Sequence, residues 1–159
     1  MHSLTGNAIK RMYEGFIEEG TRSNNGEGLK IPTSWSDYTI LIIEKSEATK
    51  MILEQSGYNS IFVTNNEREA LSIYGSEPSI NLLLIDISIR NLNGVELVRV
   101  IRQMERDKWG INEIPIFALV TDSQEEYRKT FIDSGCNDYL LKPINIRALL
   151  KKLKNFYLS

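Results

Sequence analysis

The sequence predicts an α/β fold in which helices cover both faces of an open, doubly wound parallel sheet. From residue 37 onward, five short apolar segments alternate with segments of helical periodicity. The apolar segments lack polar–apolar alternation, as expected for parallel strands buried on both faces. A closed eight-stranded barrel needs about twice the 123 residues from 37 to 159, so the sheet is expected to be open.

The five expected strands are short and rich in β-branched residues and leucine. Each contains few or no internal polar residues and is followed by a helical pattern, which gives five βα units. In chain order, the expected strands are Thr39–Ile43, Ser60–Thr64, Asn81–Ile85, Ile114–Val120 and Asp138–Leu141.

The helices between them are supported by capping pairs, in which an Asn or Ser precedes a Glu by three residues. The pairs are Asn66 with Glu69, Asn93 with Glu96 and Ser123 with Glu126. The expected helices are Ser46–Gln55, Asn66–Tyr74, Asn93–Arg106, Ser123–Ser134 and Asn145–Phe156.

Residues 1–36 differ in composition from the domain expected over residues 37–159. Apolar residues at helical spacing between Ile9 and Ile17 predict a short amphipathic helix that ends at Gly20. The polar, glycine-containing stretch Thr21–Gly28 is typical of a linker. Two interpretations of the helix stay open: it packs on the following domain, or it is a dimerisation or partner helix.

Composition excludes several classes of site. The chain holds one cysteine, Cys136, and one histidine, His2, so an internal disulfide, a cysteine-rich zinc site and a histidine-based catalytic triad are not expected. The net charge of −2 gives no basic excess for nucleic acid. No apolar run is long enough for a membrane span, and the first residues do not resemble a secretion signal. A cytoplasmic protein is therefore expected.

Polar residues end several of the predicted strands, namely Glu44, Asp86, Thr121 and Lys142. In doubly wound sheets, ligands bind outside the carboxyl ends of the strands. Asp86 follows the four apolar residues Leu82–Ile85, and a carboxylate there is costly to desolvate unless it is paired or used. We therefore expect Asp86 to be a nucleophile.

Five short motifs occur in order along the chain: Ile-Leu-Ile-Ile-Glu at 40–44, Leu-Leu-Ile-Asp at 83–86, Asn-Gly-Val-Glu-Leu at 93–97, Ile-Pro-Ile-Phe-Ala-Leu at 114–119 and Asp-Tyr-Leu-Leu-Lys-Pro-Ile at 138–144. In this order and spacing, residues 38–156 resemble the receiver domain of two-component response regulators, a CheY-like domain. The resemblance implies a flavodoxin-like (βα)5 fold with strand order 2-1-3-4-5. It also implies transfer of a phosphoryl group from a partner's phosphohistidine to an aspartate.

The resemblance assigns roles to individual residues. Asp86 corresponds to the phosphoacceptor and Lys142 to the lysine that contacts the acyl phosphate. Tyr139 corresponds to the aromatic switch residue. Glu44, Asp86 and the backbone carbonyl of Ser88 correspond to the groups that hold Mg²⁺. At most, the family's activity is phosphorylation and dephosphorylation of the domain's own aspartate.

Two positions of the expected site depart from the family pattern. Lys45 stands where the family has a second acidic metal ligand, and Val120 stands at the switch position that is usually Thr or Ser. Thr121 follows one residue late and is a weak candidate for the missing hydroxyl, because strand alternation would send it to the opposite face. These departures predict a weak Mg²⁺ site, or none.

The lysine at position 45 leaves two hypotheses open. Its ammonium group replaces the metal charge and pairs with Asp86 or Glu44, since Glu44, Asp86, Lys45 and Lys142 together carry no net charge. Alternatively, Lys45 points to water, and Glu44 and Asp86 hold a weaker metal site. The first hypothesis favours a degenerate receiver that binds proteins independently of phosphorylation, and the second favours a phosphorylated receiver.

The expected partners follow from the resemblance. They are a histidine kinase or histidine phosphotransfer protein and a downstream protein target, without direct nucleic-acid binding or membrane insertion. A dimer through the fourth and fifth helices of the domain, or through the N-terminal helix, is a further alternative. A flavodoxin-type cofactor binder is disfavoured, because Glu-Lys-Ser-Glu-Ala-Thr at 44–49 replaces a glycine-rich phosphate loop.

Overall fold

The computed structural model describes residues 37–89, 92–109, 113–121 and 128–158, and these form an α/β domain around a five-stranded sheet. All strand pairs are parallel, in the order β2-β1-β3-β4-β5, as the resemblance implies. The strands are β1 (Thr39–Ile43), β2 (Ser60–Thr64), β3 (Leu82–Asp86), β4 (Ile116–Val120) and β5 (Asp138–Leu141).

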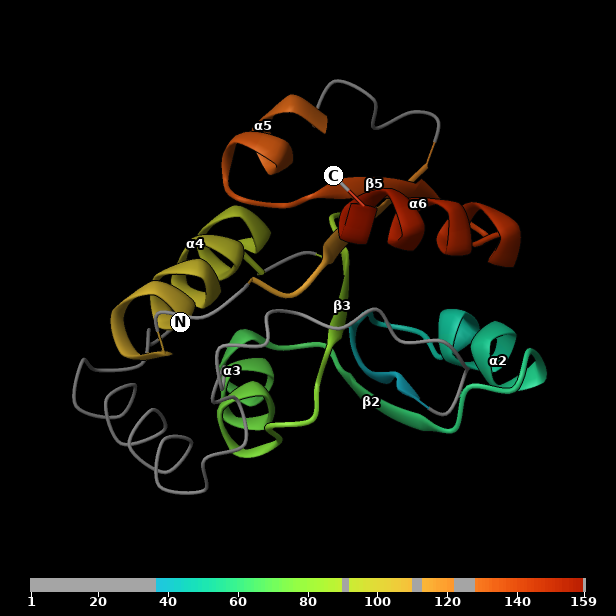
Figure 1. Ribbon diagram of the computed structural model, residues 1–159, viewed down its shortest axis with the longest axis horizontal. Coiled ribbons are helices and arrows are strands. Elements are labelled where there is room, and N and C mark those ends of the chain that lie inside the picture. Colours follow the sequence, from blue (N-terminus) through green and yellow to red (C-terminus); the bar gives the residue numbers. More distant parts are fainter. Residues whose placement is uncertain (1–36, 90–91, 110–112, 122–127, 159) are drawn as a thin grey trace.

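Helices cover both faces of the sheet. In Figure 1, α2 and α6 lie on one side of the strands, and α3, α4 and α5 lie on the other. The bounds are α2 (Ala48–Gln55), α3 (Glu67–Ser76), α4 (Gly94–Met104), α5 (Arg128–Asp133) and α6 (Ile146–Leu158). None of the described helices combines the length and the apolar character that crossing a membrane requires.

The two faces of the sheet form two separate hydrophobic cores. Leu41 and Ile43 of β1 belong to the core under α3, α4 and α5, whereas Ile40 and Ile42 belong to the core under α2 and α6. All four residues have no exposed surface. The sequence-based expectation of burial on both sides is therefore confirmed for the central strands β1, β3 and β4, whereas the edge strands β2 and β5 are only partly buried.

Two of the three predicted caps are described, and both are confirmed. The Asn66 side chain accepts a hydrogen bond from the backbone N–H of Glu69 at 2.7 Å, and Asn93 accepts one from Glu96 at 3.0 Å. Each satisfies one of the free N–H groups in the first turn of its helix. Ser123 and the region 1–36, with its predicted helix and linker, lie outside the described residues.

The predicted continuous helix over residues 93–106 was wrong at its end. Helix α4 stops at Met104, and the chain continues as a π-helical segment, Glu105–Trp109. The wider turn accompanies an inward Glu105 side chain with no exposed surface. Its carboxylate accepts hydrogen bonds from the Tyr74 hydroxyl at 3.1 Å and the Ile114 backbone N–H at 2.9 Å.

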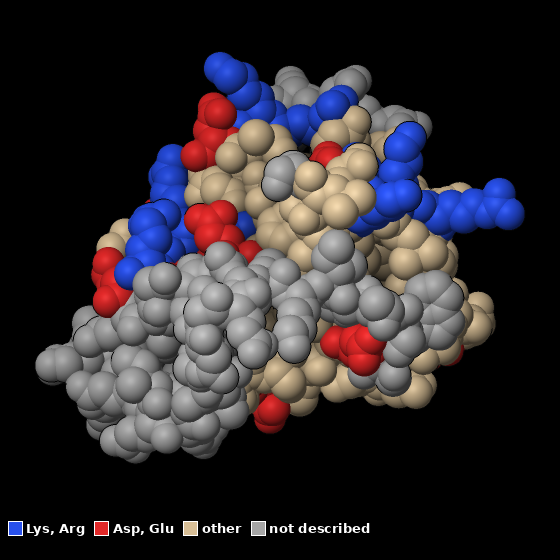
Figure 2. Space-filling view, in the orientation of Figure 1, with Lys and Arg blue, Asp and Glu red and all other residues tan. Residues whose placement is uncertain are grey.

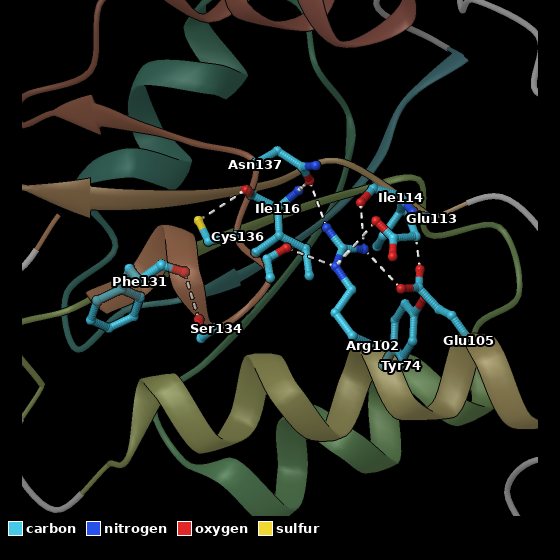
Figure 3. Close-up of polar contacts among 11 residues, drawn as sticks. Tyr74, Arg102, Glu105, Glu113, Ile114, Ile116, Phe131, Ser134, Cys136 and Asn137 are labelled. Carbon is cyan, nitrogen blue, oxygen red and sulfur yellow. Dashed lines mark hydrogen bonds and ion pairs between the residues drawn. The ribbon is translucent and has the colours of Figure 1, made fainter. Parts of the chain in front are cut away.

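A buried arginine connects this segment to the start of β4 and to the turn before β5 (Figure 3). The Arg102 guanidinium donates to Glu105 Oε1 at 2.8 Å and to the backbone carbonyl oxygens of Ile114 and Gly135, each at 2.9 Å. It also donates to Asn137 Oδ1 at 2.6 Å. Because Arg102 is only 2% exposed, these bonds replace the hydration that burial removes.

Gly135 is required at the turn that receives Arg102. Its φ of +116° is one that residues with a side chain rarely adopt, and a Cβ there would lie 2.8 Å from Arg102 Cγ. Glycine therefore permits both the turn and the close approach of the arginine.

Replacing Arg102 with methionine is expected to lower the free energy of unfolding by about 3–5 kcal/mol, because Glu105 would remain buried without its counter-ion. Arg99 is a matched control on the same helix, since it pairs at 3.9 Å with Glu96 but is 59% exposed. Arg99→Met should change the free energy by no more than about 0.5 kcal/mol. Urea denaturation followed by circular dichroism measures both, and equal losses would contradict the assignment.

Candidate functional site

The candidate site lies at the carboxyl edge of the sheet, where the parallel strands β1, β3 and β5 end. Strands β1 and β3 are neighbours, and β4 lies between β3 and β5. Asp86 is the last residue of β3, Glu44 directly follows β1, and Lys142 directly follows β5. The Asp86 and Glu44 side chains are buried, each residue being 3% exposed. The sheet therefore gathers the polar residues that follow its apolar strands, as predicted.

Asp86 and Lys142 form a direct ion pair. Lys142 Nζ donates to Asp86 Oδ2 at 2.6 Å across 56 residues of sequence. The lysine side chain is 24% exposed, whereas the aspartate side chain is 5% exposed. The buried carboxylate thus has a cation on its solvent-facing side, which offsets its desolvation.

The other oxygen of Asp86 is held by the following turn. Asp86 Oδ1 accepts hydrogen bonds from the Ser88 backbone N–H at 2.8 Å and from the Ser88 hydroxyl at 2.6 Å. Sequence reasoning considered only the backbone carbonyl of Ser88. A serine two residues after an aspartate is a local pattern that predicts such a turn, and this pattern could have revealed the contact.

Glu44 is oriented by the first turn of α2. Its Oε2 accepts from the Thr49 backbone N–H at 3.2 Å, and its Oε1 accepts from the Thr49 hydroxyl at 2.9 Å. A carboxylate at a helix N-terminus is favourable because the free N–H groups there carry partial positive charge. Thr49 was missed by the sequence reasoning, since nothing in its spacing from Glu44 identifies the contact.

Lys45 does not form the ion pair considered from the sequence. It is exposed, and among the described residues no acid lies within ion-pair distance of its ammonium group. Asp86 pairs with Lys142 instead, and Glu44 binds Thr49. Lys45 is exposed, as the hypothesis of a lysine that points to water expects, and the choice between the two hypotheses stays a prediction.

The two predicted switch positions lie on neighbouring strands. Val120 is the last residue of β4 and is buried, and Tyr139 is a half-buried residue of β5. The guanidinium carbon of Arg128 lies 3.7 Å from the centre of the Tyr139 ring, and Lys152 Nζ lies 4.6 Å from it. Thr121 directly follows β4 and is half-buried. Its catalytic role stays a prediction.

The residues present meet the minimum for a magnesium site. Mg²⁺ in proteins is commonly bound by one or two carboxylates together with water and phosphate oxygens. Glu44 and Asp86 are two such carboxylates, and the Ser88 carbonyl follows Asp86 closely in sequence. Within the described ranges, no cluster of three or more acidic, histidine or cysteine side chains could hold a metal.

The buried cysteine does not add a reactive group. Burial raises the pKa of the Cys136 thiol to about 11, so the thiol is protonated at neutral pH and a poor nucleophile. Its Sγ lies 3.1 Å from the carbonyl oxygen of Ile116 and 3.0 Å from that of Asp138. Cys136 therefore packs as a core residue.

Comparisons with known proteins identify relatives of the whole domain. Residues 40–154 match the family model of the response regulator receiver domain. Two-component response regulator 24 of Arabidopsis thaliana is 32% identical over 130 residues, which cover 78% of this chain and 88% of that protein. The CAI-1 autoinducer sensor kinase/phosphatase CqsS of Vibrio cholerae is 28% identical over 157 residues, which cover 96% of this chain but 22% of that protein.

A solved structure shows the same fold. The co-crystal structure of the Saccharomyces cerevisiae phosphotransfer protein Ypd1 and the receiver domain of its response regulator Ssk1 matches with a TM-score of 0.63 and 27% identity. The match covers 77% of this chain and 90% of that chain. The chain spans only about a fifth of the length of CqsS but most of the plant regulator. On this evidence, the chain belongs to the response regulator receiver domains, through which two-component phosphorelays pass their signal.

Proposed function

We propose that Asp86 accepts a phosphoryl group from the phosphohistidine of a partner histidine kinase or phosphotransfer protein. The observation that carries the proposal is the ion pair between Lys142 Nζ and Asp86 Oδ2, at 2.6 Å, on the carboxyl edge of the sheet. The Ypd1 and Ssk1 pair supports the class of partner, because a phosphotransfer protein there binds a receiver domain of this fold.

The proposed step replaces one bond to phosphorus with another. An oxygen of the Asp86 carboxylate attacks the phosphorus atom, the bond from phosphorus to the histidine nitrogen breaks, and an acyl phosphate forms on Asp86. The histidine leaves with the electron pair of the broken bond and takes up a proton. Such transfers require an in-line nucleophile and neutralisation of the charge on the phosphoryl oxygens rather than covalent help from other residues.

The residues around Asp86 supply both requirements. The two Ser88 hydrogen bonds fix the carboxylate, so the nucleophile is oriented before the donor arrives. Lys142 already faces the carboxylate, and its partly exposed ammonium group can move onto the transferred phosphoryl oxygens. Lys142 thus pairs with the Asp86 carboxylate before the transfer and with the phosphoryl oxygens after it, so its ammonium group has an anionic partner throughout.

Glu44, Asp86 and the Ser88 carbonyl would hold Mg²⁺ in this site, and the metal would add positive charge beside the phosphoryl oxygens. Each of the two carboxylates already accepts hydrogen bonds from protein groups on both oxygens. Lys45 contributes a positive charge where a third carboxylate would attract the metal. We therefore expect Mg²⁺ to bind weakly.

Phosphorylation is tested with phosphoramidate, which contains the same type of phosphorus–nitrogen bond as phosphohistidine. Intact-mass measurement should detect one added phosphoryl group on the unchanged chain and none on Asp86→Asn. The matched control is Asp133→Asn, which removes an exposed acid at the end of α5 and should leave the adduct unchanged. An adduct on Asp86→Asn, or none on the unchanged chain with and without Mg²⁺, would reject Asp86 as the acceptor.

Metal binding is tested by titration calorimetry with Mg²⁺. Lys45→Asp should tighten binding by about tenfold or more, because it removes a cation from the site and adds a carboxylate ligand. Lys50→Asp makes the same charge change within α2 and should have a much smaller effect. Equal tightening in the two variants would show that overall charge, rather than the ligand at position 45, controls the affinity.

A further inference from the structure

An asparagine at the amino edge of the sheet, opposite the candidate site, joins the starts of the last two strands. Asn137 directly precedes β5, and Ile116 is the first residue of β4. The Asn137 backbone N–H donates to the carbonyl oxygen of Ile116 at 2.8 Å. Asn137 Oδ1 accepts from the backbone N–H of the same isoleucine, also at 2.8 Å. The side chain thus extends the hydrogen-bond ladder by one bond beyond the first residue of β5.

A second asparagine makes the same pair of contacts between β3 and β1. Asn81 directly precedes β3, and its backbone N–H donates to the carbonyl oxygen of Thr39 at 3.0 Å. Its Oδ1 accepts from the Thr39 backbone N–H at 2.8 Å. Asn81 lies five residues before Asp86, as Asn137 lies five residues before Lys142. The two strands that carry the ion pair at their ends are therefore fixed in the same way at their starts.

The position of Lys142 depends on the register of β5. This strand has four residues and pairs with β4 alone among the described strands. A slip of one residue would move the chain by about 3.3 Å and turn each side chain to the opposite face. Leu141 or Pro143 would then take the place of Lys142, and neither carries a cation. The contact of 2.6 Å with Asp86 therefore requires the observed register.

Charge alone does not select Lys142 as the partner of Asp86. Figure 2 shows Lys and Arg side chains gathered over α5 and α6, the helices before and after β5 in the chain. Asp86 nevertheless pairs with the lysine that directly follows β5. Alignment of the strand brings this particular cation to the carboxylate.

A buried cation holds Asn137 in place (Figure 3). Arg102 Nη2 donates at 2.6 Å to Asn137 Oδ1, the oxygen that also accepts from Ile116. The same guanidinium donates to the carbonyl oxygens of Ile114, before β4, and of Gly135, before β5. One rigid group thus connects the chain that enters β4 with the chain that enters β5.

We propose that Asn137, held by Arg102, is a positioning residue for phosphoryl transfer, because it fixes the register of β5 so that Lys142 reaches Asp86. The proposal rests on the proposed phosphoacceptor function of Asp86, and it assigns a part in that function to a residue at the opposite edge of the sheet. Asn81 has a smaller effect, because β3 has a neighbour on each side whereas β5 has one among the described strands.

Intact-mass measurement at successive times after addition of phosphoramidate tests the proposal. Asn137→Ala should slow the addition of the phosphoryl group by about tenfold or more, since a displaced ammonium group no longer meets the phosphoryl oxygens. Asn137→Asp keeps an acceptor oxygen and should restore most of the rate. Asn66→Ala is the matched control, because it removes an asparagine acceptor from a backbone N–H outside the sheet. An unchanged rate in Asn137→Ala, or an equal loss in Asn66→Ala, would overturn the proposal.

A second background separates positioning from a general loss of structure. Asn137 is exposed, so its truncation opens no cavity in the core. In the Lys142→Met chain, Asn137→Ala should cause no further slowing, because the group that it positions is absent. Asn81→Ala should have the same small effect in both backgrounds, because it does not act through Lys142. Equal slowing by Asn137→Ala in the two backgrounds would contradict the proposal.

The alignment is also measured without a phosphodonor, by urea denaturation. The effects of Asp86→Asn and Lys142→Met on the urea midpoint should not add when the two are combined, because they remove the partners of one ion pair. In the Asn137→Ala chain the two effects should add, and persistent non-additivity there would overturn the proposal. Restored additivity in a chain that accepts no phosphoryl group would support the alignment and reject only the phosphoacceptor function.

Discussion

The parallel pairing of five short apolar strands is the constraint on which the remaining structure depends. Because the central strands β1, β3 and β4 are buried on both faces, polar groups that serve a site stand where these strands end or on the covering helices. Parallel strands also bring those ends to one edge, so Asp86 and Lys142 meet across 56 residues. The same pairing leaves β5 at the margin of the sheet, where Tyr139 is reached by cations from two helices. The candidate site at Asp86 and the position of Tyr139 thus both follow from strand placement.

Two charge systems at different places in the sheet are built in different ways. The Arg102 guanidinium donates hydrogen bonds to four acceptors and is almost fully buried. The loss of any of these partners would therefore leave a buried polar group without a hydrogen bond. Lys142 makes one short bond to Asp86 and keeps about a quarter of its side chain in solvent. The first arrangement suits a permanent connection between α4, β4 and the turn before β5. The second suits a counter-ion that must follow a changing anion.

The sequence predicted the strands and most helix starts because apolar periodicity and capping pairs are local. The bounds of β1, β2 and β5 agree with expectation, and Asn66 and Asn93 cap as predicted. Resemblance to a family assigned Lys142 to the acyl phosphate on Asp86, but the ion pair between Lys142 and Asp86 itself was not predicted. The bond between Glu44 and Thr49, and the direction of the long Lys45 side chain, depend on backbone geometry that periodicity does not encode. Arg102 and Arg99 likewise appear equivalent in sequence, although only Arg102 is buried.

The contact between Glu44 and Thr49 links the candidate magnesium site to helix α2. Thr49 donates both its backbone N–H and its hydroxyl to the carboxylate that a divalent cation would recruit. A cation that drew Glu44 away from the helix would weaken these two hydrogen bonds at the beginning of α2. By thermodynamic reciprocity, conditions that fray the first turn of α2 favour the cation, and the bound cation favours fraying. A bound cation and the helix terminus would then compete for the Glu44 carboxylate.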